Sequence, residues 1–343
     1  SLFGILSLYL FYQLNLKNFF YYNYLMLFFL SIAFIWAIIH KGCLVKLRWK
    51  LSIEHIKKYI EEFYQYSHPL FIYSLIGLIV GILDRWLLQF FAGSVQQGFY
   101  SLSYQIGAIC FLFTSAMTPL LMREFSIAFG NKDLHQMAYL FRRYILLPPT
   151  LLVLLHFKRK RLFIIFGGNK YKEAAMAVTI MAFYPIHQTY GQLSDAVFYA
   201  TGQTSLYRNI GVLFMLIGLP VTYFLIAPVD KWGLNAGATG LAIEMVILQF
   251  IGVNVQLYFN AKFLKLSFWK YVGYQLFSVG CMLSCAAVVT FLVNHALGSY
   301  VDVVTSFVLA GSFYTIIVGC LVYYKPVVFG LKSEDFSLIK WLH

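Results

Sequence analysis

Long apolar runs separated by short polar gaps make up most of this chain. We recognise ten such segments. They cover residues 2–14, 21–40, 69–91, 99–122, 137–157, 172–199, 209–227, 238–259, 271–293 and 301–324. Runs of about 18 or more apolar residues are typical of membrane-spanning helices. The pattern therefore predicts an all-α polytopic membrane protein with about ten transmembrane helices.

The gap at residues 41–68 is basic and differs from the others. Its apolar residues recur at the spacing of one helix face, among them Ile53, Ile56, Ile60 and Phe63. This spacing predicts an amphipathic helix at the cytoplasmic membrane surface.

Composition agrees with a membrane protein. Of the 343 residues, 61% are hydrophobic and 11% are charged, whereas a soluble domain carries about 25% charged residues. The net charge of +13 could suggest nucleic acid. However, most basic residues lie in alternate gaps between apolar runs, as the positive-inside rule expects, and no nucleic-acid motif accompanies them. The stretch FKRKRLFIIFGGNKYKE at 157–173 is the exception, because it holds six basic residues on the side predicted to be outside.

Motifs for catalysis, metal binding or cofactor binding are not found. The five cysteines include no CxxC pair, and there is no HExxH, GxxxxGK[ST] or GxSxG. We expect no enzyme activity, no cofactor and no metal site. A membrane enzyme of glycan assembly is the alternative, but such enzymes usually carry larger extramembrane loops than this chain has.

Asp84 and Arg85 are adjacent charges inside the segment 69–91. Ionisable residues in membrane spans are costly, and they usually face a bundle interior or a wet cavity. Asp84 shares a helix face with Gly77 and Gly81, while Arg85 is rotated by about 100°. Each charge is therefore expected to have its own partner. The functional interpretation is anion binding by Arg85, with Asp84 as a proton or ion site, and the alternative is a structural ion pair with another helix.

A polar stripe lies on the segment 172–199. Its five residues are spaced by three or four positions and so share one helix face: Tyr184, Gln188, Gln192, Asp195 and Tyr199. Aromatic, amide and carboxylate groups suit sugar rings and hydroxyls, although hydrogen bonds between helices would also explain the stripe. Glu244 is a second acidic residue within a span and a candidate site for a coupling ion.

Several short motifs occur in an order that resembles a known superfamily. They read LDRWLLQFFAGSVQQGFYSLSYQIG, TSAMTPLLMREFS, IIFGGNKYKEAA and DAVFYATGQTSLYRN. This series, across residues 69–208, resembles the C-terminal lobe of the multidrug/oligosaccharidyl-lipid/polysaccharide exporters. The closest branch contains the Wzx-type O-antigen flippases.

The resemblance implies two lobes of six helices that alternate access to a central cavity. Residues 1–40 would then be the last two helices of the first lobe, and 41–68 the cytoplasmic linker. Residues 69–259 would be the second lobe, and 260–343 two added helices and a cytoplasmic tail. The chain begins at Ser1 inside an apolar run, so we expect a fragment that lacks about four helices and does not transport alone.

The resemblance also implies a function. A flippase in the bacterial cytoplasmic membrane would move a polyprenyl-pyrophosphate-linked oligosaccharide, with Arg85 on the pyrophosphate and the 184–199 stripe on the sugars. Asp84 and Glu244 would couple transport to H+ or Na+, and the expected partners are membrane lipids and glycan polymerase machinery. A cation-coupled multidrug or small-molecule exporter of the same fold is the alternative, and it would not need Arg85.

Overall fold

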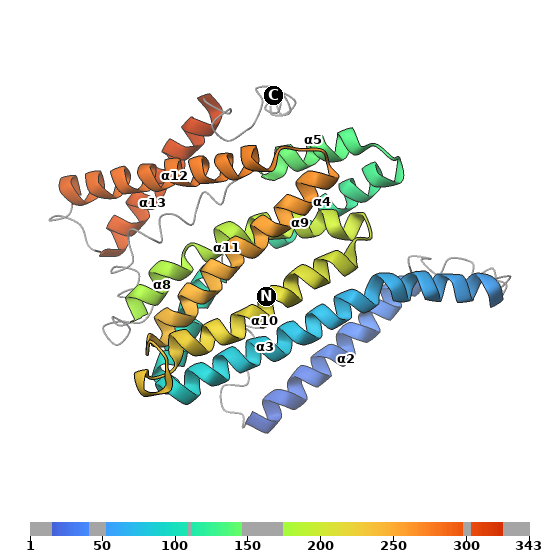
Figure 1. Ribbon diagram of the computed structural model, residues 1–343, viewed down its shortest axis with the longest axis horizontal. Coiled ribbons are helices and arrows are strands. Elements are labelled where there is room, and N and C mark those ends of the chain that lie inside the picture. The colour runs from blue at the N-terminus through green and yellow to red at the C-terminus, as the bar shows by residue number, and fades with distance from the viewer. Residues whose placement is uncertain (1–15, 41–52, 109–110, 146–173, 298–302, 325–343) are drawn as a thin grey trace. The chain divides into compact units, whose positions relative to one another are not determined.

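The computed structural model describes residues 16–40, 53–108, 111–145, 174–297 and 303–324, and these ranges are helical with short turns and no strand. The helices, labelled in Figure 1, are α2 (Leu16–His40), α3 (Ile53–Ala108), α4 (Phe111–Gly130), α5 (Leu134–Ile145), α8 (Ala175–Met181), α9 (Tyr184–Ala200), α10 (Thr204–Ile226), α11 (Gly237–Phe263), α12 (Phe268–Leu297) and α13 (Val303–Tyr324), with the short 3-10 helix η2 (Val229–Lys231). The predicted all-α class is confirmed for these ranges.

The chain forms two compact units, residues 1–62 and 63–343. In the first unit, α2 carries large apolar side chains that are exposed to the surroundings, including Phe28, Phe34 and Trp36. The second unit holds the helices from residue 63 onward, and the candidate site lies within it. The predicted domain boundaries stay predictions.

In the part of the chain that the structure describes, four helices are long and apolar enough to cross a membrane. They lie at 53–105, 204–226, 237–263 and 268–293, and shorter apolar helices occupy 24–37 and 308–321. These helices are compatible with a membrane-embedded protein. The finer prediction of ten spans includes more segments than these helices. Some of the predicted segments fall partly or wholly outside the described residues, among them 2–14 and the part of 137–157 after residue 145.

Helix α3 runs from the predicted linker through segment 69–91 and into segment 99–122. Its backbone leaves helical geometry at Gly93, where φ is 84° and ψ is 171°. A residue with a side chain would be strained at this positive φ, so glycine permits the change of direction. After the break, the Gln96 side-chain oxygen accepts a hydrogen bond of 3.0 Å from the backbone N–H of Ala238, near the start of α11.

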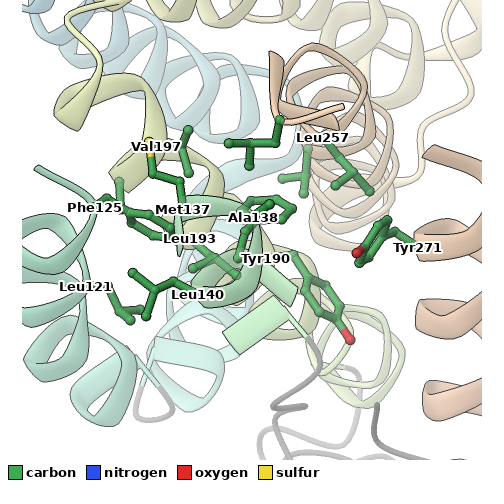
Figure 2. Close-up of a cluster of buried hydrophobic side chains, with 14 of the residues drawn as sticks. Leu121, Phe125, Met137, Ala138, Leu140, Tyr190, Leu193, Val197, Leu257 and Tyr271 are labelled. Atoms are coloured by element: carbon green, nitrogen blue, oxygen red, sulfur yellow. The ribbon is translucent and has the colours of Figure 1, made fainter. Parts of the chain in front are cut away.

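The largest hydrophobic core joins α4, α5, α9, α11 and α12. Figure 2 shows Phe125 of α4, Met137 of α5 and Tyr190 of α9 gathered in it, and all three are fully buried or nearly so. The buried residues of α5 lie at 137, 138, 140 and 141, one face of a helix. This face holds α5 against the bundle, and the side chain of Arg142 is exposed.

The predicted segment 172–199 is two helices. α8 ends at Met181 and α9 begins at Tyr184 with Pro185 in its first turn, where the missing N–H of proline costs no helical hydrogen bond. The buried clusters on either side of α9 contain Leu88, Tyr100 and Tyr184 in one case and Phe198, Tyr207 and Ile210 in the other.

Candidate functional site

A cavity of about 320 Å³ lies among α3, α9, α10 and α11. Its lining residues come from all four helices: Tyr73, Gly77, Val80, Gly81, Asp84, Tyr184, Gln188, Gly191, Asp195, Tyr207, Ile210, Gly211, Phe214, Met215, Glu244, Met245, Leu248, Gln249, Gly252, Val253 and Gln256. The volume is within the range of small-molecule sites, about 300–1,000 Å³.

The polar lining of the cavity is acidic and neutral. Among the residues that the structure describes, three carboxyl groups line it, from Asp84, Asp195 and Glu244, and no Lys, Arg or His does so. Within the described residues, no three His, Cys, Asp or Glu side chains are close enough to hold a metal ion.

Asp84 and Glu244 lie at one end of the cavity. Glu244 is 6% exposed, and in the described part of the chain its carboxyl group makes no hydrogen bond or ion pair. Its Oε1 lies 2.8 Å from the position that a Cβ on Gly218 would take, so the missing side chain at Gly218 leaves room for the carboxyl group. The Oδ1 of Asp84 is buried and has no hydrogen-bond partner among the described residues.

Asp195 lies at the other end, against a group of tyrosines. The hydroxyl of Tyr207 donates to Oδ2 of Asp195 at 3.4 Å, while Oδ1 is buried without a partner in the ranges described. The ring of Tyr207 packs on Tyr73 and Tyr199, with centroid separations of 4.7 and 5.2 Å. The hydroxyl of Tyr66 donates to the backbone carbonyl of Tyr199 at 3.2 Å.

A hydrogen bond between two amides crosses the middle of the site, where Nε2 of Gln249 donates to Oε1 of Gln188 at 2.6 Å. Glycines provide the space around it. A Cβ on Gly81 would meet no atom within 4 Å, although one on Gly191 would approach Val253 at 3.0 Å. The cavity is therefore open beside α3 and tight where α9 meets α11.

The sequence-predicted site residues divide into two groups. Five of them line the cavity: Asp84, Tyr184, Gln188, Asp195 and Glu244. The other three are not among the lining residues. Arg85 is exposed on α3, Tyr199 packs on Tyr207, and Gln192 has a buried Oε1 with no hydrogen-bond partner in the described structure. The roles proposed for all eight stay predictions.

Most of the other lining residues were not predicted as site residues, and Tyr73 and Tyr207 are two polar examples. A signal for Tyr73 was present, because it precedes Gly77 by four positions and continues the stripe of Gly77, Gly81 and Asp84. Tyr207 similarly precedes Gly211 by four positions on α10.

Comparison with family models, with curated proteins and with solved structures found no match to this chain.

Proposed function

We propose that the chain belongs to a multi-pass exporter of the bacterial cytoplasmic membrane that moves a polyprenyl-pyrophosphate-linked oligosaccharide by alternating access. The proposal takes its cargo and its two-lobed architecture of about ten helices in this chain from the motif resemblance across residues 69–208. From the fold it takes the apolar helices long enough to cross a bilayer.

The observation that carries the proposal is the acid-lined cavity. Glu244 is buried on a helix apolar enough to span a membrane, and among the described residues no basic group lines the cavity beside it. Burial of an unpaired carboxyl group costs free energy, and ionisable residues retained in spans commonly mark ion or substrate pathways. A transport role accounts for this cost, with Asp84 and Glu244 as the coupling groups.

The cavity size limits what part of the cargo it can hold. A volume of about 320 Å³ suits one small group and not an oligosaccharide. Tyr184, Gln188 and Asp195 can contact a single sugar there. Arg85 is exposed on α3, so the pyrophosphate would bind on that exposed face, where a guanidinium can form two parallel hydrogen bonds to phosphate oxygens.

The test uses the full-length gene in a deletion strain, with polyprenyl-linked glycans measured by mass spectrometry and surface polymer by blot. Deletion should cause lipid-linked repeat units to accumulate. Arg85→Ala should fail to complement, and Arg85→Lys should complement poorly because the bidentate geometry is lost. Arg123→Ala is the matched control, since Arg123 is an exposed arginine on α4. Full complementation by Arg85→Ala would refute the pyrophosphate role.

A cation-coupled small-molecule exporter is the second candidate. One observation favours it: Asp84 and Glu244 line the cavity, whereas Arg85 does not. This candidate predicts new drug sensitivity on deletion, with unchanged lipid-linked glycans. The same deletion strain therefore distinguishes the two functions.

A further inference from the structure

The cavity has two acidic ends at a defined separation. On α9, Tyr184 and Asp195 are eleven residues apart, and on α3 the same number separates Tyr73 from Asp84. Eleven residues of α-helix rise about 16 Å. All five of these residues line one cavity: Asp84, Tyr184 and Glu244, together with Tyr73 and Asp195. The cavity is therefore an elongated slot, with Asp84 and Glu244 at one end and Asp195 at the other.

The free polar atoms of this slot are hydrogen-bond acceptors. The buried oxygens without a partner among the described residues include Oδ1 of Asp84, Oδ1 of Asp195 and Oε1 of Gln256. Buried acceptors of this kind are normally satisfied, by water or by a ligand that supplies donors. An alkylammonium group carries three N–H donors and no acceptor.

The Asp195 end also provides aromatic walls. Tyr73 and Tyr207 both line the cavity, and the Tyr207 hydroxyl contacts the carboxylate of Asp195. A cation beside a tyrosine ring is attracted by the ring quadrupole, and the attraction grows when water is excluded. A carboxylate beside aromatic rings thus favours an organic ammonium.

The middle of the slot suits a hydrocarbon chain. Its walls there include Ile210, Phe214 and Leu248, and the amides of Gln188 and Gln249 bond to each other. Gly81 leaves open space beside this section. Methylene groups would contact apolar side chains here without leaving polar groups unsatisfied.

We propose that this slot binds a linear diamine or polyamine, with one ammonium group at Asp84 and Glu244 and another at Asp195. The site goes beyond the proposed export of a lipid-linked oligosaccharide and gives the same cavity a different ligand, and the inference rests on the slot alone. The separation of the two acidic ends makes chain length the property that the site selects.

The test is a titration of the full chain in nanodiscs with α,ω-diamines of increasing length. Each diamine is paired with the n-alkylamine of the same carbon number, and empty nanodiscs give the background from lipid partitioning. Dissociation constants come from isothermal titration calorimetry. Affinity should pass through a maximum at one chain length, and that diamine should bind about tenfold or more tightly than its monoamine, since it pairs with a second buried carboxylate.

Two variants identify the site. Asp195→Asn should weaken the best diamine more than its monoamine, so that the advantage of the diamine over the monoamine is lost. Gly81→Leu should weaken every amine because its side chain enters the open part of the slot, whereas Gly273→Leu should not, since Gly273 is exposed on α12 with no atom near its Cβ position.

Several results would overturn the proposal. The proposal fails if the wild-type chain binds no amine. It also fails if diamine affinity does not depend on the number of carbon atoms between the two amines. Unchanged diamine affinity in Asp195→Asn would overturn it as well. Binding of Na+ alone, measured by the same calorimetry, would instead assign the slot to an inorganic ion. None of these results depends on glycan export, so the proposed function is tested separately.

Discussion

Replacement of Glu244 by methionine should stabilise the fold. Glu244 is 6% exposed as a residue, and in the described part of the chain its carboxyl group has no hydrogen-bond or ion-pair partner. A buried unsatisfied polar group costs about 1–3 kcal/mol, and replacing buried charges with apolar side chains of similar volume is often stabilising. Methionine keeps the length of the side chain and removes the carboxyl group.

The expected gain in the free energy of unfolding is therefore about 1–3 kcal/mol. For a chain of this size, each kcal/mol shifts the unfolding midpoint by roughly 2 °C, so a rise of several degrees is expected. The assay is thermal unfolding of the purified chain in detergent, followed by tryptophan fluorescence at a fixed scan rate.

Glu124→Met is the matched control. The Glu124 side chain is 49% exposed and lies 3.9 Å from Arg123, and such surface pairs contribute little. Its midpoint should stay close to that of the wild-type chain. A clear fall in the midpoint for Glu244→Met would refute the reasoning, because it would show that the carboxyl group has a stabilising partner.

Two further substitutions test the packing around the cavity. Gly211→Ala should destabilise the fold by roughly 1–3 kcal/mol, because the new Cβ would overlap the Tyr73 ring. The control Gly273→Ala, whose new Cβ lies in open space, should be neutral or slightly stabilising. Equal unfolding midpoints for the two variants would contradict this prediction. A double-mutant cycle of Gln188→Ala and Gln249→Ala should give a coupling energy of about 0.5–1.5 kcal/mol in chemical unfolding, since their side chains are 2.6 Å apart. Additive effects would show that the bond contributes nothing.

The helices were predictable because apolar runs of spanning length have few alternatives in a bilayer. Segments 209–227, 238–259 and 271–293 correspond to α10, α11 and α12, whose apolar windows are long enough to span. The break at Gly93 was only partly predictable. A glycine in a polar gap indicates a turn, but the surrounding residues stay helical on both sides, and only the backbone shows that one residue makes the change.

The angular position around α9 explains which stripe residues reach the cavity. At about 100° per residue, Gln188 and Asp195 lie within about 40° of Tyr184, and all three line the cavity. Tyr199 and Gln192 lie about 60° and 80° away, and neither is a lining residue. Spacing by three and four positions placed these residues on one broad helix face. It could not show which part of that face lines the cavity and which part contacts neighbouring helices.

The same geometry accounts for the adjacent charges of α3. Asp84 lies about 20° from Tyr73 around the helix, and both side chains line the cavity. Arg85 is about 100° further round and exposed. An exposed arginine on an apolar helix is costly in lipid, so that face of α3 requires water, an anion or protein against it. The two charges thus lie on different faces of α3. Substitutions at Asp84 should affect occupancy of the cavity, and substitutions at Arg85 should affect only what binds on the exposed face of the helix.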